Sequence, residues 1–450
     1  MPETERPRRR TRSRWRDLAV LVSVLAIVAA CGISAQSPSP GSTATSTDAA
    51  PTEGPVTTGA PPTATGPGET AGATEGPTAT ETTGPTATPE SPLPSPAGQV
   101  VFGNWPAYMQ FSRRTGSFPM IDKFEQDTGI DATYLEDIND NSEFFNIIQP
   151  DLALGNHTGY DLIVPSDWMI ERLIRLGYIQ PLDYRLLPNF QANVAELYLD
   201  PWYDPGNVYS IPWQAGIVGI GYNTRLTGRP ITSFEDLLDP TFAGRVGMFS
   251  EMIDTMCLTI LSLGVDCGQA TIEDAGRARD KLLEAAERGQ FRDFYGNDYY
   301  DQLAGGNLAI TMAWSGDISQ MKLYDNPDVE FVVPETGGLL FVDNMVIPNY
   351  TPHYADAHLM MDFWYDLDNA TAQTEWVGYF SPVRGVPERV LQDAQTARDE
   401  GDEEWAMQLE IISQTAFPSE EQLANVHDYK VLTEDEERTW NNLFNEVVID

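Results

Sequence analysis

The segment Tyr160-Asp161-Leu162-Ile163-Val164-Pro165-Ser166-Asp167-Trp168 indicates the fold class, because a short strand in it runs directly into a helix. Residues 161–164 end in an apolar run of strand length, and residues 167–176 place their apolar side chains at helical spacing. A strand that turns at once into a helix is the building unit of α/β folds.

The same alternation continues on both sides of this segment. Strands are predicted at residues 100–103, 161–164, 216–222, 245–249, 308–313, 329–333 and 345–347, and helices at residues 118–128, 142–154, 167–176, 254–263, 272–287 and 353–367. The sequence contains no internal repeat. This alternation predicts α/β lobes with mostly parallel sheets and a ligand site at the carboxyl ends of the strands.

Residues 1–31 are typical of an export signal. Seven arginines between Arg6 and Arg16 precede an apolar run over residues 18–30. As a helix this run rises about 20 Å, too little for a membrane core of roughly 30 Å, so a signal peptide is indicated. Its end, Val28-Ala29-Ala30-Cys31, resembles the lipobox of bacterial lipoproteins, in which the cysteine carries the lipid. An ordinary signal peptide with an incidental cysteine is the alternative.

Residues 32–98 are predicted to be a disordered linker. They consist almost entirely of Ser, Thr, Pro, Gly and Ala, without lysine or arginine. Such a segment buries too little apolar surface to offset its conformational entropy, and its prolines keep it extended. We therefore expect a monomeric domain over residues 99–450, held outside the cytoplasm on the periplasmic or cell-surface side of the membrane by Cys31.

The formal net charge is −40, and nearly all of it belongs to residues 99–450. A charge this negative repels nucleic acid and favours cationic ligands by long-range attraction, although solubility explains it equally well. Cys257 and Cys267 are ten residues apart, which suits either a small-loop disulfide or two unpaired core residues. The four histidines and these cysteines show no zinc spacing, so no metal or cofactor is expected.

Enzyme motifs give no support for catalysis. The sequence contains no G-x-S-x-G, H-E-x-x-H, P-loop or strand-linked G-x-G-x-x-G pattern, and we assign no catalytic residue. A binding protein is the prediction. A secreted hydrolase or a wall-associated interaction domain is the alternative from another class.

Aromatic and acidic side chains follow several predicted strands at their carboxyl ends. They are Trp105, Tyr108, Ser166, Trp168, Glu251, Asp254, Trp314, Phe341, Asp343 and, further along, Tyr379. Each has a simpler explanation by itself: the aromatic residues as core, and Glu251 as a complement to the N-terminus of the helix that follows it.

These segments together resemble the spermidine/putrescine-binding proteins of ABC transporters, which have the two-lobed type II periplasmic-binding-protein fold. The resemblance covers about residues 100–390. It is carried, in the family's order, by F-x-N-W-x-x-Y, Y-D-L-I-V-P-S, Y-S-I-P-W, G-G-x-x-x-x-D-x-x-x-I-P and G-Y-x-x-P. It implies one lobe from about residues 99–213 and 341–388, another from about 214–340 and 389–450, and a hinge between them.

The resemblance also implies roles for the residues above. An aromatic wall would consist of Trp105, Tyr108, Trp168, Trp314, Phe341 and Tyr379, with Ser166, Glu251, Asp254 and Asp343 as polar partners of a polyamine. A membrane permease would receive the ligand. Phe341, Trp168 and Glu251 depart from the family's usual tryptophan, tyrosine and aspartate, so the particular polyamine stays open. The family's C-terminal glutamine has no match here, and His427 and Asp428 lie in that vicinity unassigned.

The same fold also binds ferric iron, commonly through adjacent tyrosines. Tyr299 and Tyr300 are such a pair, and phenolate oxygens suit Fe(III). Against this role, the pair sits in a polar stretch, residues 296–301, that could be a surface loop. A ferric-iron receptor of this fold is therefore the second hypothesis.

Overall fold

The structure, a computed structural model, describes residues 91–448. The predicted signal peptide, Cys31 and the predicted linker up to residue 90 lie outside the described residues. The last part of the predicted linker, from residue 91, forms neither helix nor strand before Gly98, and the first strand begins at Gln99.

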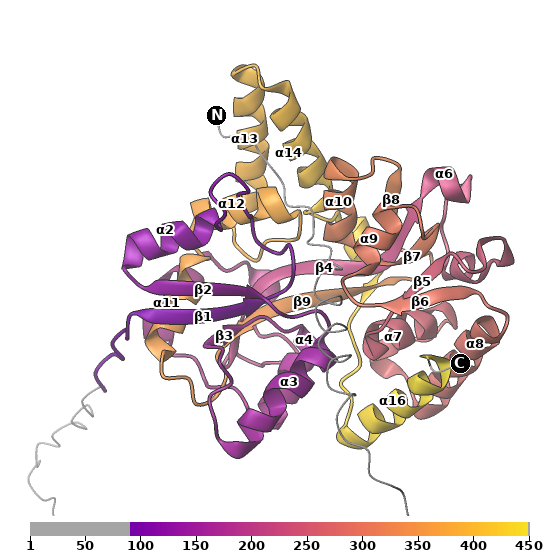
Figure 1. Ribbon diagram of the computed structural model, residues 1–450, viewed down its shortest axis with the longest axis horizontal. Coiled ribbons are helices and arrows are strands. Elements are labelled where there is room, and N and C mark those ends of the chain that lie inside the picture. Colours follow the sequence, from indigo (N-terminus) through magenta and orange to yellow (C-terminus); the bar gives the residue numbers. More distant parts are fainter. Residues whose placement is uncertain (1–90, 449–450) are drawn as a thin grey trace, which may run out of the picture. The chain divides into compact units, whose positions relative to one another are not determined.

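A ten-stranded mixed sheet organises the folded part (Figure 1). Its strands are β1 (Gln99–Asn104), β2 (Asp131–Glu136), β3 (Leu162–Ile163), β4 (Ser210–Asn223), β5 (Val246–Phe249), β6 (Phe291–Tyr295), β7 (Ile310–Trp314), β8 (Val329–Val332), β9 (Gly338–Val346) and β10 (Val426–His427). The strand order is β2-β1-β3-β9-β4-β7-β5-β6, with β8 paired to β4 and β10 to β9.

Helices cover this sheet. They are α2 (Pro119–Thr128), α3 (Asn141–Leu154), α4 (Asp167–Arg175), α5 (Pro188–Asn193), α6 (Thr224–Thr227), α7 (Met252–Ser262), α8 (Ile272–Glu287), α9 (Tyr299–Ala304), α10 (Ser315–Tyr324), α11 (Tyr354–Phe363), α12 (Leu367–Val377), α13 (Val386–Asp399), α14 (Glu403–Thr415), α15 (Glu420–Leu423) and α16 (Glu434–Val448). Among the described residues no helix is both long and apolar enough to cross a membrane.

Two groups of parallel strands form two lobes. We call β1, β2 and β3 with α2, α3, α4 and α11 the first lobe, and β5, β6 and β7 with α7, α8, α9 and α16 the second lobe (Figure 1). The long strands β4 and β9 run between the lobes and pair with each other along most of their length. The predicted lobe limits at 213/214 and 340/341 fall inside these two strands, and the limit at 388/389 falls inside α13. The limits themselves stay a prediction.

The crossing strands correct the expectation of a mostly parallel sheet. β1 pairs in parallel with β2 and β3, and β5 with β6 and β7, as predicted. However, β4 is antiparallel to β7, β8 and β9, and β3 is antiparallel to β9. Each crossing strand is therefore antiparallel to the lobe strand beside it, β9 to β3 and β4 to β7. The register of β4 shifts between Pro212 and Gln214, beside the predicted lobe limit.

The helix ends follow local sequence rules. Thr271 begins α8 with a capping box in which its hydroxyl and the Asp274 carboxylate bond each other's main-chain N–H. Asp140 caps α3 by accepting from the N–H of Glu143, and Gly155 ends that helix in the left-handed conformation. The predicted limits of α8 are the observed ones, and those of α2, α3 and α4 lie within one residue.

Cys257 in α7 and Cys267 are joined by a disulfide, with 5.2 Å between their Cα atoms. Both side chains are fully buried. Of the two alternatives that the sequence left open, the structure has the bridge. It ties the second lobe's α7 to the turn that precedes α8.

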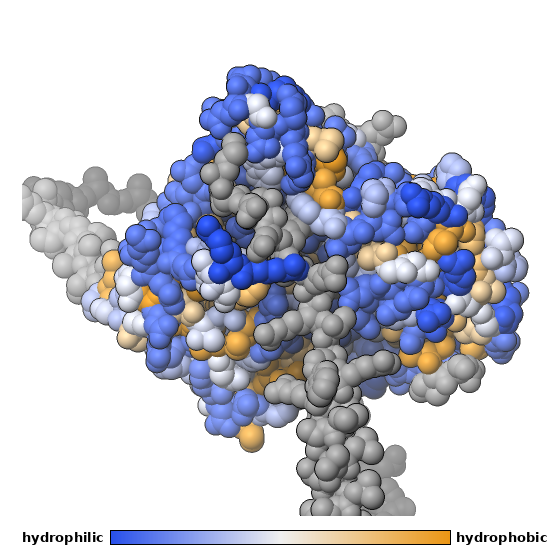
Figure 2. Space-filling view, turned by 45° about the horizontal axis from the view of Figure 1, so that its top comes forward, coloured by the Kyte–Doolittle hydropathy of each residue, from blue (hydrophilic) through white to orange (hydrophobic). Residues whose placement is uncertain are grey.

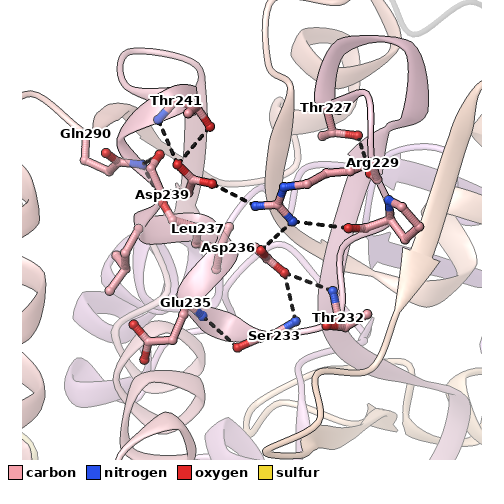
Figure 3. A network of polar contacts seen from close by, with 12 residues as sticks. Thr227, Arg229, Thr232, Ser233, Glu235, Asp236, Leu237, Asp239, Thr241 and Gln290 are labelled. Atoms are coloured by element: carbon pink, nitrogen blue, oxygen red, sulfur yellow. Dashed lines mark hydrogen bonds and ion pairs between the residues drawn. The ribbon is translucent and has the colours of Figure 1, made fainter.

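Surface charges are largely paired or solvated. Figure 2 shows a mostly hydrophilic face, with hydrophilic residues covering the α13–α14 hairpin at the top. Between β4 and β5, the Arg229 guanidinium pairs with Asp236 at 2.7 Å and Asp239 at 2.8 Å (Figure 3). Hydrogen bonds from Thr241 and the Arg229 guanidinium lower the pKa of Asp239. In this network, therefore, the acids Asp236 and Asp239 share a basic partner.

Candidate ligand-binding pocket

One pocket lies at the carboxyl ends of β1, β3, β5 and β7 and encloses about 510 Å³ of space including its mouth. Its lining comes from both lobes and from β9. It consists of Trp105, Pro106, Ala107, Tyr108, Asn141, Ser166, Trp168, Glu251, Asp254, Asn297, Trp314, Asp317, Phe341, Asp343, Tyr379 and Tyr429. The structure therefore brings together every residue that the sequence singled out for ligand contact.

The aromatic side chains are fixed by the elements behind them. The Trp105 indole N–H donates to the Val164 carbonyl at 2.7 Å, which links the loop after β1 to the end of β3. Trp314 stacks on Phe249 with ring centroids 4.3 Å apart, so one of its faces is covered. Tyr108 meets Tyr379 edge-to-face at 4.9 Å. These contacts hold the rings in place before any ligand arrives.

Two glycines make room for the aromatic wall. A Cβ atom at Gly316 would stand 2.3 Å from the ring of Tyr379. A Cβ at Gly216 in β4 would stand 2.6 Å from the Phe341 ring and 3.1 Å from Tyr379. Since real Cβ contacts are longer than this, both rings can occupy their positions because these residues lack side chains.

Asp343 lies on β9, one of the two strands that run between the lobes. One of its oxygens accepts from the Ser166 hydroxyl at 2.7 Å and the other from the Tyr108 hydroxyl at 2.9 Å. Only 5% of the residue is exposed. Burial raises the pKa of Asp343 from 3.8 to about 7, although both hydrogen bonds oppose the rise.

Glu251 and Asp254 form a second acidic group, in the second lobe. Asp254 accepts from the Tyr429 hydroxyl at 2.5 Å. Burial raises the pKa of Asp254 to about 7, with smaller contributions from the charges of Asp140 and Asp343. Burial also raises the pKa of Glu251 well above its usual value. Glu251 does not cap its own helix: its side chain makes no capping bond to α7 and instead accepts from the N–H of Asn141 in the first lobe.

Sequence reasoning missed three polar lining residues that contact predicted ones: Asp317, Tyr429 and Asn141, which bonds Glu251 and Ser166. Asp317, at the start of α10, accepts from the Tyr379 hydroxyl at 2.9 Å. It stands three residues after Trp314, the same i, i+3 spacing after a strand that singled out Glu251 and Asp254, so a usable signal existed. Tyr429 comes from the C-terminal segment, where the resemblance was poor. The nearby His427 lies in β10 beside Leu339 and does not line the pocket in the described part of the chain.

The pocket carries four carboxylates and, among the described lining residues, no lysine or arginine. This separates it from the Arg229 network, in which each acid has a basic partner. A buried acid without a base is costly unless it is protonated or meets a cation. Within residues 91–448 no group of three or more His, Cys, Asp or Glu residues is arranged to hold a metal ion. The pocket thus combines four carboxylates with aromatic rings.

The tyrosine pair of the iron hypothesis lies elsewhere. Tyr299 and Tyr300 begin helix α9 and are buried, so they do not lie in the surface loop that the polar stretch allowed. The Tyr300 hydroxyl donates to Asp325 at 2.6 Å, while the Tyr299 hydroxyl accepts from the N–H of Trp314 at 3.2 Å. Neither tyrosine is among the described residues that line the pocket. The two hydroxyls thus contact different residues, Asp325 and Trp314.

Comparison with known proteins agrees with this geometry. The model of the family described as bacterial extracellular solute-binding protein matches residues 119–401. The chain belongs to the bacterial extracellular solute-binding proteins. This solute-binding protein is 26% identical over 284 residues to spermidine/putrescine-binding periplasmic protein 1 of Haemophilus influenzae, covering 61% of the chain and 75% of that protein. It is 28% identical over 261 residues to the putrescine-binding periplasmic protein PotF of Escherichia coli, covering 54% and 68% respectively.

Solved structures share the fold. A putative spermidine/putrescine ABC transporter protein from Listeria monocytogenes superimposes with a TM-score of 0.66 and 26% identity, over 78% of this chain and 99% of that one. The substrate-binding protein PotD from Streptococcus pneumoniae gives 0.61 with 24% identity over 78% and 99%. The predicted two-lobed periplasmic-binding-protein fold is confirmed. The family match of this solute-binding protein ends at residue 401, so Tyr429 and α16 lie beyond it.

Proposed function

We propose that this solute-binding protein captures a polyamine, putrescine or spermidine, outside the cytoplasm and delivers it to an ABC transporter permease. A lipid on Cys31 would hold it at the membrane. It acts by binding and release, without catalysis. The names of its relatives support the ligand class, because several are polyamine-binding proteins.

The observation that carries the proposal is the combination of four carboxylates with aromatic faces in one pocket. Glu251, Asp254, Asp317 and Asp343 line one pocket together with a wall of tryptophan, tyrosine and phenylalanine rings. A polyamine has the complementary pattern of ammonium groups separated by methylene chains. Ammonium–carboxylate hydrogen bonds hold the charged groups, and aromatic faces cover the stem. Each cation–π contact adds about 0.5–2 kcal/mol.

A ligand with a single amine, or a simple metal ion, pairs with fewer of these acids than a polyamine does. Asp343 lies where β9 crosses between the lobes, whereas Glu251 and Asp254 follow β5 in the second lobe. Acids on separate elements suit a ligand with more than one positive centre. A neutral sugar would leave the carboxylates buried and uncompensated.

A thermal-shift panel tests the ligand class. The panel contains putrescine, spermidine, amino acids, sugars and ferric citrate, each added to the full-length protein. We expect the two polyamines to raise the melting temperature, since a ligand at a hundredfold excess over its Kd stabilises by about 2.7 kcal/mol. A shift with ferric citrate or a sugar, and none with either polyamine, would contradict the proposal.

A further inference from the structure

Glu251 contacts both lobes at once. It follows β5 in the second lobe, and one of its carboxylate oxygens accepts from the main-chain N–H of Asn141 at 2.5 Å. Asn141 is the first residue of α3, in the first lobe. The two residues are 110 positions apart in the chain and meet across the pocket that both of them line.

The other oxygen of Glu251, Oε2, is unused. It is buried and has no hydrogen-bond partner among residues 91–448. The residue as a whole is only 3% exposed. A buried carboxylate oxygen without a donor is unfavourable, so this atom is the place in the pocket where a donor of the ligand would bind.

The surroundings make this contact unfavourable in an empty pocket. Burial, followed by the charges of Asp140 and Asp254, raises the pKa of Glu251, and the hydrogen bonds from Asn141 oppose the rise. Asp140 belongs to the first lobe and also accepts from the hydroxyl of Ser250, which is in the second lobe, at 3.0 Å. Closure of the two lobes therefore brings Asp140 of the first lobe close to Glu251 and Asp254 of the second. A cation relieves their repulsion, and the N-terminus of α3 favours an ionised acceptor.

We propose that Glu251 couples occupation of the pocket to closure of the two lobes. Its Oε2 receives the ammonium group of the ligand, and its Oε1 binds the first N–H of α3 in the opposite lobe. Glu251 is thus a positioning residue for α3 as well as a ligand contact. This inference rests on the proposed function, because it requires a cationic ligand.

A matched pair of variants isolates the N–H of Asn141. Asn141→Ala and Asn141→Pro both remove the side chain, which bonds Ser166, but only proline removes the N–H. Proline is well tolerated at the first position of a helix. The preceding residue, Asp140, is extended with φ −154° and ψ 138°, as a residue before proline must be. The two variants should therefore fold alike, which their melting curves would verify.

The first readout is putrescine and spermidine affinity of the full-length protein by calorimetry. A hydrogen bond to a charged group contributes enough that Asn141→Pro should bind about 10- to 100-fold more weakly than Asn141→Ala. Equal affinities in the two variants would overturn the coupling. Wild-type binding of neither amine would instead refute the proposed function, so the two failures are distinguishable.

The second readout is closure. Fluorophores on the exposed positions Leu154 in α3 and Ile272 in α8, introduced as cysteines with Cys31→Ser, report the distance between lobes. At saturating putrescine, Asn141→Ala should approach the closed distance, whereas Asn141→Pro should stay open. Glu251→Gln keeps an acceptor but no charge, so it should bind weakly yet close once saturated. A Glu251→Gln protein that is saturated and remains open would contradict separate roles for the two oxygens.

Discussion

At the scale of single residues, the buried acids of the pocket lower the stability of the ligand-free protein. Asp343 and Asp254 are buried with hydroxyl donors instead of basic partners, and their pKa values rise to about 7. The folded protein therefore holds protons that the unfolded chain would release near neutral pH. Under the proposed function a cationic ligand would replace those protons, so the residues that destabilise the ligand-free protein would be those that favour the complex.

Asp343→Asn should stabilise the ligand-free protein above neutral pH. Because the folded pKa is raised from 3.8 to about 7, stability from this group is present at low pH and is lost as pH rises through 7. The upper bound of that loss is about 4 kcal/mol. An asparagine stays neutral, and the Ser166 and Tyr108 hydroxyls can donate or accept. Urea unfolding should give a gain of about 1–4 kcal/mol at pH 8 and a smaller one at pH 5.

Asp239→Asn is the control for that measurement. Its carboxylate is paired with Arg229, and its pKa is lowered, so neutralising it should give no gain at pH 8. Equal free energies of unfolding for wild type and Asp343→Asn at pH 8 would show that burial of the ionised Asp343 carboxylate does not destabilise the folded protein.

Gly316→Ala should weaken ligand binding through Tyr379. The new methyl group would occupy the place of the Tyr379 ring and break its hydrogen bond to Asp317. Losing one aromatic face and one oriented acid should reduce polyamine affinity about 5- to 30-fold by calorimetry. Gly276→Ala in α8 is the control, since no atom of the described residues lies within 4 Å of its Cβ position. An unchanged affinity in Gly316→Ala would mean that Tyr379 is not part of the contact.

At the scale of elements, α16 reaches from the second lobe to the first. It packs on α8 and α7 through buried residues that include Trp440 and Phe444. Its Glu437 forms an ion pair with Arg172 of α4 at 2.7 Å and a longer one with Arg175 at 3.6 Å. Glu437 lies beyond the segment that the family model matches, whereas Arg172 and Arg175 lie within it. The ion pair adds a second tie between the lobes, apart from the contact of Glu251 with α3.

Glu437→Gln should therefore speed ligand release. A partly exposed ion pair contributes at most about 1 kcal/mol, so we expect dissociation to be about 2- to 5-fold faster. Stopped-flow tryptophan fluorescence measures this rate, because three tryptophans line the pocket. Glu446→Gln is the matched control: it lies on the same helix but pairs with Arg279 of α8, within the second lobe. Equal rates in the two variants would exclude a role for the pair across the lobes.

The elements that the sequence predicted well are those with local signals. The capping box at Thr271 and the proline and glycine that bound α2 are readable from a few residues. The edge strand β6 was missed, because Phe291–Tyr295 mixes charged residues with aromatic ones. α10 was missed because it begins at Ser315-Gly316, and the glycine, a poor helix former, is there to leave room for the Tyr379 ring. The antiparallel course of β4 and β9 depends on contacts between distant segments, which periodicity does not report.

The candidate site was predictable to the extent that it stands at strand ends. Trp105 directly follows β1, Trp314 is the last residue of β7, and Ser166 stands three residues after β3. Their order matched a family pattern. Tyr429 reaches Asp254 from 175 residues away, and Asn141 reaches Glu251 from 110. Neither contact leaves a local trace in the sequence. The tertiary structure supplied the residues through which the two lobes and the C-terminal segment meet.

At the scale of the whole molecule, export and anchoring depend on residues outside the described part. Cys31→Ser should release the protein from the membrane fraction or leave its signal peptide uncleaved. The reason is that stable anchoring needs more than one lipid chain, and all of them would be attached at this cysteine. Fractionation followed by immunoblotting measures this. The same distribution in wild type and variant would disprove a lipid anchor at Cys31.

The central claim, that the acidic aromatic pocket binds a polyamine, is tested most directly by titration calorimetry at pH 8. Wild type and Asp343→Asn are each titrated with putrescine and with spermidine. Wild type should bind at least one of them. Asp343→Asn should bind about 30- to several-thousand-fold more weakly, because losing one partner of a buried charge pair costs about 2–5 kcal/mol. Wild-type binding of neither amine, or full affinity in Asp343→Asn, would contradict the claim.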